Sequence, residues 1–168
     1  RDQHSIDRAD HEGHEVVVED ERRQCEGTDP ELSSSNDVRR SKTALSRFSF
    51  SRPVQQLLKH GMLSAGRTLF DYGCGLGDDV RGLCKMGIDA TGWDPVLMSE
   101  AEKTHADVVN LGFVINVVED PSERIEVLKE AFSLATHLLV TAVQIGRGDE
   151  GSNGRPYRDG VLTTRGTF

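Results

Sequence analysis

The sequence has little that would suit a membrane-embedded or disulfide-bonded protein. No apolar run approaches the ~20 residues that a membrane helix needs, and no charged-then-apolar leader opens the chain. There are only three cysteines, an odd number whose spacing matches no disulfide scaffold. With 36% apolar and 29% charged residues, the composition indicates a soluble protein from a reducing compartment, and we expect it to be cytoplasmic.

Apolar residues are also scarce in residues 1–40, where Val16–Val18 is the only cluster. This segment carries 6 Lys/Arg against 12 Asp/Glu, so it holds a charge of −6 out of a total of −8. Such a composition cannot bury enough apolar surface to offset the entropy of ordering, and we predict a disordered acidic tail. Residues 41–168 are nearly neutral, so the net charge of the chain does not exclude DNA or RNA as a partner of this part. Four possible metal ligands in the tail match no zinc spacing, so no metal site is expected: His4, His11, His14 and Cys25.

The stretch Leu69–Asp79 combines an apolar run, three glycines and three acids. The apolar run ends at Asp71 and has the form of a buried strand. The glycines follow on alternate positions, at Gly73, Gly75 and Gly77. Glycine permits a turn with positive φ angles and lets a ligand approach bare backbone, while Asp78 and Asp79 favour a helix start. The stretch therefore predicts a strand, a turn and a helix N-terminus, the usual ligand site of an α/β sheet.

Strand-like and helix-like segments alternate along the rest of the chain. Apolar runs predict four strands, at Arg67–Asp71, Ile88–Trp93, Ala106–Val114 and His137–Ile145. Helical patterns begin at Pro53, after the glycine turn and after the third strand. This alternation predicts an α/β protein with a parallel sheet and helices on its faces. Only a turn or two of helix fits between the second and third strands, and Gly146–Gly160 is expected to be a loop.

Asp120–Glu123 carries the clearest local signal of a helix start. Asp120 suits the N-cap, Pro121 takes the first helical position, and Glu123 can reach back as in a capping box. The apolar residues that follow recur at helical spacing. We expect them to form one buried stripe, made of Ile125, Leu128, Phe132 and Ala135.

Residues 41–52 contain three cations and no acid. The cations are Lys42, Arg47 and Arg52. One interpretation is a lobe that contacts a phosphate backbone. The other is an exposed connector in which Phe48 and Phe50 are buried, and the sequence alone favours this second interpretation.

The residues of the glycine turn separate two cofactor classes. A dinucleotide turn needs a third small residue at the place of Asp78. A pyrophosphate would also be repelled by the nearby carboxylates of Asp71, Asp78 and Asp79. S-adenosylmethionine carries an ammonium and a sulfonium and no phosphate, so an acidic turn suits it. A nicotinamide-dependent enzyme is therefore the weaker alternative.

Three motifs occur in order, at Asp71–Gly77, at Asp94 and at Ile115–Pro121. Together they resemble class I S-adenosylmethionine-dependent methyltransferases, in which an acid like Asp94, 23 residues after Asp71, binds the ribose hydroxyls. The resemblance implies a Rossmann-like core and S-adenosylmethionine as the cofactor. The cofactor-binding residues that it implies are Asp71, Gly73, Gly75, Gly77, Asp94, Asn110 and Gly112.

The resemblance also implies a role for each of these residues. The three glycines would cradle the methionine part of the cofactor. Asp71 would hold the turn and receive the ammonium through water. The backbone from Asn110 to Gly112 would border the transferred methyl group.

Six segments carry a narrower resemblance, at Lys42–Arg47, Phe70–Gly75, Gly92–Pro95, Val108–Phe113, Glu119–Pro121 and Asp159–Phe168. They look like the methyltransferases encoded beside bacterial DNA phosphorothioation genes. That resemblance implies a role in DNA modification or defence, with DNA or a DNA-modification complex as the partner. Because those proteins continue further, and because the chain starts at Arg1 without a methionine, we expect a fragment.

Two features depart from the methyltransferase pattern. The short span from Asp94 to Ala106 leaves no room for the usual third strand, and the sixth and seventh strands are absent. In the strand numbering of that superfamily, with the third strand reduced or absent, the expected sheet order is therefore 2-1-4-5. The expected domains are the tail at 1–40, a connector and leading helix at 41–66, and a truncated S-adenosylmethionine-binding domain at 67–168.

The sequence assigns no catalytic residue. Asn110–Phe113 lies where DNA amino-methyltransferases carry an Asn/Asp-Pro-Pro-aromatic signature, but both prolines are missing. No Pro-Cys pair suits attack on cytosine, and Cys74 and Cys84 are expected to be packing residues. A non-catalytic module of a DNA-modification complex, with the same fold, is therefore the alternative to a methyltransferase.

Overall fold

The computed structural model of the protein describes residues 38–44, 46–64, 66–145 and 154–168. Nearly all of the predicted acidic tail, with its four possible metal ligands, lies outside these residues. Within the described part of the chain, no helix is long and apolar enough to cross a membrane.

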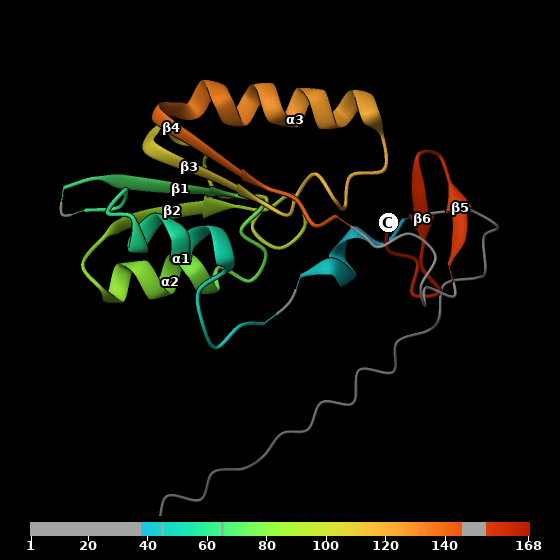
Figure 1. Ribbon diagram of the computed structural model, residues 1–168, viewed down its shortest axis with the longest axis horizontal. Helices are drawn as coiled ribbons and strands as arrows, with labels where there is room; N and C mark the ends of the chain where they lie inside the picture. Colours follow the sequence, from blue (N-terminus) through green and yellow to red (C-terminus); the bar gives the residue numbers. More distant parts are fainter. Residues whose placement is uncertain (1–37, 45, 65, 146–153) are drawn as a thin grey trace, which may run out of the picture. The chain divides into compact units, whose positions relative to one another are not determined.

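Four parallel strands form the central sheet: β1 (Thr68–Tyr72), β2 (Asp89–Trp93), β3 (Ala106–Gly112) and β4 (Ala135–Ala142). β1 pairs with β2 and β3, and β3 pairs with β4, so the order is β2-β1-β3-β4. Helices flank the sheet (Figure 1), an arrangement compatible with a Rossmann-like fold. The α/β class and the four predicted strands are confirmed, with small shifts at their ends.

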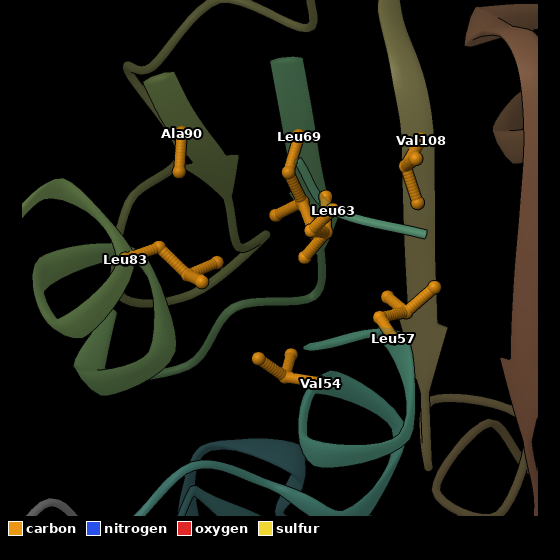
Figure 2. Packing of buried hydrophobic residues seen from close by; sticks show 7 residues of the cluster. All are labelled: Val54, Leu57, Leu63, Leu69, Leu83, Ala90 and Val108. Atoms are coloured by element: carbon orange, nitrogen blue, oxygen red, sulfur yellow. The ribbon is translucent and has the colours of Figure 1, made fainter. Parts of the chain in front are cut away.

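Two apolar clusters hold helices on the two faces of the sheet. On one face lie α1 (Arg52–Lys59) and α2 (Asp78–Lys85), and Figure 2 shows how their side chains meet those of the sheet. The central members of this cluster are Val54, Leu57, Leu69, Leu83 and Val108. On the other face, α3 (Pro121–Leu134) packs Ala131 and Leu134 against β1 and β3. The sheet is therefore covered on both faces, as a parallel sheet requires.

The strand order differs from the predicted 2-1-4-5. In the described chain no strand lies between β2 and β3, so Ala106–Gly112 is the third strand and the order is 2-1-3-4. The intervening residues form turns, with one isolated bridge between Asp94 and Met98, instead of the predicted turn or two of helix. The span is too short for a crossover helix. A helix of so few residues is marginal in water unless it packs against a partner.

The predicted buried stripe of α3 is wrong. Three of its members are exposed, by 55% for Ile125, 42% for Leu128 and 69% for Phe132. The residues that pack against the sheet are Val127, Ala131 and Leu134. Both sets recur at helical spacing, so periodicity alone could not choose between two adjacent faces of the helix.

The start of α3 is confirmed, but the capping box is not formed. The Asp120 carboxylate accepts hydrogen bonds from the backbone N–H of Ser122 at 2.8 Å and of Glu123 at 3.4 Å. The Glu123 carboxylate instead binds the guanidinium of Arg40 at 2.6 Å. Arg40 opens a short 3₁₀ helix, Arg40–Thr43. A long-range ion pair has therefore replaced a local cap.

Part of the predicted C-terminal loop is a hairpin. β5 (Arg155–Tyr157) and β6 (Gly160–Leu162) pair antiparallel. Ion pairs connect this hairpin to the start of α3: Arg124 binds Asp159 at 2.6 Å, and Arg158 binds Asp120 at 2.7 Å. These contacts join residues far apart in the sequence, and no local pattern reveals them.

Two side chains that were expected inside are exposed. Phe48 is fully exposed, whereas Phe50 packs against the cluster under α1 and α2. Cys84 is exposed on α2, and Cys74 is half-buried in the glycine turn. The interpretation of residues 41–52 as a connector that buries both phenylalanines is therefore wrong for Phe48.

Two leucines of α3 test this packing, because the same substitution falls once on the buried face and once on the exposed face of the helix. Leu134 is 7% exposed and Leu128 is 42% exposed. Leu134→Ala should lower the free energy of unfolding by about 2–5 kcal/mol through the cavity that it leaves. Leu128→Ala should change it by about 0.5 kcal/mol or less. Urea unfolding followed by circular dichroism measures both, and equal losses would contradict the orientation of α3.

Candidate functional site

A cavity of about 610 Å³ lies at the carboxyl ends of β1, β2 and β3, and we call it the β1–β3 cavity. Its walls include the turns that follow these strands, at 73–76, 93–97 and 112–114. Its volume falls within the ~300–1,000 Å³ of small-molecule sites. The chain leaves β1 for β2 on one side and then crosses to β3 on the other. A crevice at such a switch point is where open α/β sheets bind ligands.

The structure brings four of the seven predicted cofactor-binding residues to this cavity. The four that line it are Gly73, Gly75, Asp94 and Gly112. The three that do not line it are Asp71, Gly77 and Asn110. The predicted set therefore divides into residues that a ligand can touch and residues that support them.

Backbone hydrogen bonds hold the glycine turn against the end of β2. The N–H groups of Gly73 and Cys74 both donate to the carbonyl of Trp93, at 2.8 and 3.0 Å. Gly73 and Gly77 have φ angles of 80° and 72°, in the left-handed region that favours glycine. A Cβ on Gly73 would lie 2.4 Å from Cγ2 of Val114, so this position also lacks room for a side chain. Glycine is required here for conformation and for space.

Asp94 joins the glycine turn to the turn after β2. One carboxylate oxygen accepts from the N–H of Gly75 at 3.1 Å. The other accepts from Val96 and Leu97, at 2.9 and 3.0 Å. A carboxylate offers about four lone-pair sites, so the three backbone bonds leave acceptor capacity on a group that lines the cavity. Asp94 therefore shapes the site and can still bind a hydroxyl.

Asp71 and Asn110 form a buried pair between β1 and β3. The Asn110 side-chain amide donates to the Asp71 carboxylate at 2.8 Å. Burial raises the pKa of Asp71 to about 7, opposed by the bond from Asn110 and reinforced by the nearby charge of Asp79. The side-chain oxygen of Asn110 is buried and has no partner among the described residues. This pair is part of the sheet interior rather than a wall of the cavity.

Asp78 and Asp79 bind the segment that precedes α1. The Asp78 carboxylate accepts from the N–H of Arg47 at 2.7 Å and pairs with Arg81. The Asp79 carboxylate accepts from the N–H of Ser51 at 2.8 Å. The bond from Arg47 is the largest cause of a lowered pKa at Asp78. These two acids therefore anchor that segment, and they also line the β1–β3 cavity together with Asp94.

An aromatic and charged cluster builds part of the wall near β2 and α3. Tyr72, Trp93 and Glu130 line the cavity. The ammonium of Lys103 lies 3.9 Å from the centre of the Trp93 ring and 2.7 Å from a Glu130 oxygen. The Tyr72 hydroxyl donates to Glu130, and burial is the largest cause of the raised pKa of Tyr72. Sequence reasoning missed this cluster, since its members come from four separate segments.

The cysteine thiol that lines the cavity is poorly suited to nucleophilic attack. This thiol belongs to Cys74. Burial, together with the nearby charges of Asp71 and Asp94, raises its pKa to about 12. A thiol with such a pKa supplies almost no thiolate near neutral pH. What the site offers is bare backbone at Gly73 and Gly75, several carboxylates, and apolar side chains.

Gly73→Ala tests the space at the turn, and Gly87→Ala is its matched control. Both glycines have φ near +80°, but nothing lies within 4 Å of a Cβ on Gly87. Each substitution should cost about 1–2 kcal/mol for the left-handed backbone. Gly73→Ala should cost a further ~1–3 kcal/mol through the clash with Val114. Urea unfolding compares them, and equal costs would argue against the close approach of Val114.

Asp71 predicts a pH dependence of stability. Its pKa is raised to about 7 in the folded protein, against about 3.9 in an unfolded chain. Between these values the folded state binds the extra proton, so stability should fall as pH rises from about 4 to about 7. Asp71→Asn should remove this fall, because the amide does not ionise.

Urea unfolding at pH 5 and pH 8 measures this effect. The drop in stability between the two should be smaller for Asp71→Asn than for the parent chain. Asp89→Asn, on the exposed start of β2, should keep the parent's drop. An identical drop in all three proteins would show that Asp71 does not titrate in this range.

Comparisons with known proteins add no family to this geometry. Neither a scan against protein-family models nor a search of the curated proteins finds a match for the chain. The function of the β1–β3 cavity therefore rests on its own residues and on the motifs of the sequence.

Proposed function

We propose that the chain is the S-adenosylmethionine-binding part of a class I methyltransferase, and that the β1–β3 cavity holds the cofactor. The observation that carries the proposal is the position of Asp94. Its carboxylate lines the same cavity as Gly73 and Gly75 and accepts a hydrogen bond from Gly75 at 3.1 Å. The acid and the glycine turn are thus parts of one site, as their order in the sequence predicts.

The residues present fit this cofactor. Gly73 and Gly75 expose backbone to the cavity, and a Cβ on Gly73 would meet Val114. Asp94 retains acceptor capacity for the hydroxyls of a ribose. The apolar wall includes Val96, Leu97 and the Trp93 ring, which suit a flat, weakly polar base. A pyrophosphate would face the carboxylate of Asp94, so a dinucleotide fits less well.

Each residue would contribute binding and position. The glycine turn would hold the methionine part, Asp94 would hold the ribose, and the backbone at Gly112 would border the reacting side. When bound, S-adenosylmethionine supplies an electrophilic methyl group on a sulfonium. The protein's own contribution would be to orient the partners and exclude water, which accounts for a large share of the catalysis of bimolecular reactions.

DNA modification is the proposed setting of this activity. The support is the resemblance to methyltransferases encoded beside DNA phosphorothioation genes, which runs through the glycine turn and Gly92–Pro95. Both segments contribute walls to the β1–β3 cavity. We propose DNA, or a complex that modifies DNA, as the partner.

A non-catalytic module is the second candidate function. It is favoured by the position of Asn110, which occupies the place of a signature residue but is buried beside Asp71 and does not line the cavity. Transfer of a labelled methyl group to plain and to phosphorothioated DNA separates the candidates. Labelled DNA supports the methyltransferase, whereas cofactor binding without any transfer supports the module.

Isothermal titration with S-adenosylmethionine and S-adenosylhomocysteine tests the cofactor. Asp94→Ala should weaken binding by about 10- to 150-fold, the loss of one charge-assisted hydrogen bond. Asp89→Ala removes an exposed acid from the other end of the same strand and should leave binding unchanged. Absence of binding in the parent chain, or equal binding by the parent and Asp94→Ala, would exclude the proposal.

A further inference from the structure

Phe48 is the most exposed large apolar side chain among the described residues. A single exposed apolar residue is common on protein surfaces and needs no explanation by itself. Phe50, two residues later, packs against the apolar cluster of α1 and α2, so a phenylalanine of this segment can be buried. Its ring lies over Gly82 of α2, where a Cβ would come within 2.5 Å of it. The chain thus buries one phenylalanine and presents the other.

The segment that presents Phe48 is fastened on both sides. The N–H of Arg47 donates to Asp78 at 2.7 Å, and the N–H of Ser51 donates to Asp79 at 2.8 Å. The side chain of Gln55 donates to the carbonyl of Phe50 at 2.6 Å. An aromatic ring on a backbone held in this way loses little conformational entropy when it binds a partner.

Cations surround Phe48 in the sequence, and acids are absent. We call Lys42, Arg47, Phe48 and Arg52 together the Phe48 surface. Its three cations are exposed and form no ion pair with another described residue. The two acids that contact the segment are already bound, Asp78 by the N–H of Arg47 and the side chain of Arg81, and Asp79 by the N–H of Ser51. The Phe48 surface is therefore positively charged.

The Phe48 surface borders the β1–β3 cavity. Arg47 lines that cavity, together with Thr43 and Ala44 from the same segment. Ala44 lies 3.5 Å from the position that a Cβ would take on Gly75. A partner that rests on Phe48 would therefore lie at the cavity's edge.

We infer that the Phe48 surface is a platform for single-stranded nucleic acid. One base stacks on the Phe48 ring, and Lys42, Arg47 and Arg52 contact the phosphates on either side. Stacking needs an exposed base face, which unpaired strands offer and a duplex hides. An acidic protein would use the cations but would not need the ring. As an assignment of the methyl acceptor, this inference rests on the proposed function; as a binding surface it stands independently.

Fluorescence anisotropy with labelled 20-nucleotide DNA and RNA strands tests the platform on the full chain. Phe48→Ala and Phe48→Leu should weaken binding by about 5- to 150-fold, the loss of one stacked base. Phe48→Trp should retain it, because the indole also stacks. Phe132→Ala and Lys129→Ala, both at exposed positions of α3, are the matched controls and should bind like the parent.

Salt dependence separates the ring from the cations. Replacing both Arg47 and Arg52 by Ala should reduce the slope of log affinity against log salt by about 1.4, or about 0.7 for each phosphate contact on a single strand. Phe48→Ala should leave that slope unchanged while it lowers affinity at every salt concentration. If Phe48→Ala changed the salt slope as much as the arginine substitutions do, the assignment of stacking to the ring and of phosphate contacts to the cations would be contradicted.

Three results would overturn the inference. They are no binding to either strand, equal binding to the duplex form of the same sequence, or equal binding by Phe48→Ala and Phe132→Ala. Equal competition by polyglutamate would indicate an acidic protein as the partner instead. Titration of the same preparations with S-adenosylhomocysteine keeps the two proposals apart, since cofactor binding does not require Phe48.

Discussion

The hydrogen bond between the Asp94 carboxylate and the N–H of Gly75 joins the two turns that make the site. Parallel strands place the ends of β1 and β2 side by side, but they leave the loops beyond those ends free to diverge. Asp94 closes the gap, because its second oxygen also accepts from Val96 and Leu97. Asp94 thus reinforces the bonds that Gly73 and Cys74 donate to the Trp93 carbonyl, and it is also the group proposed to bind the ribose.

The remaining acids of the glycine region have different tasks. Asp71 is buried with Asn110 inside the sheet, where its raised pKa reflects the cost of burying charge. Asp78 and Asp79 hold the segment that carries Phe48. The acids of the turn therefore act as an internal scaffold, and Asp78 and Asp79 also line the cavity beside Asp94, where their charge would repel a pyrophosphate.

Local patterns predicted the strands, the glycine turn, the N-cap at Asp120 and the position of Asp94. Each of these features is determined by residues that are close in the sequence, or by the point at which a single strand ends. The buried face of α3 could not be predicted, because two apolar faces have the same spacing. The exposure of Phe48 and the Lys103–Trp93–Glu130 cluster follow from contacts between distant segments. Tertiary packing decides such cases, and one sequence holds no signal for them.

A crystal structure of the protein with S-adenosylhomocysteine tests the central proposal most directly. The ligand should occupy the β1–β3 cavity, with the ribose hydroxyls within hydrogen-bond distance of Asp94 and the amino-acid part along Gly73 and Gly75. A ligand bound elsewhere, or one whose ribose makes no contact with Asp94, would contradict the assignment of this cavity.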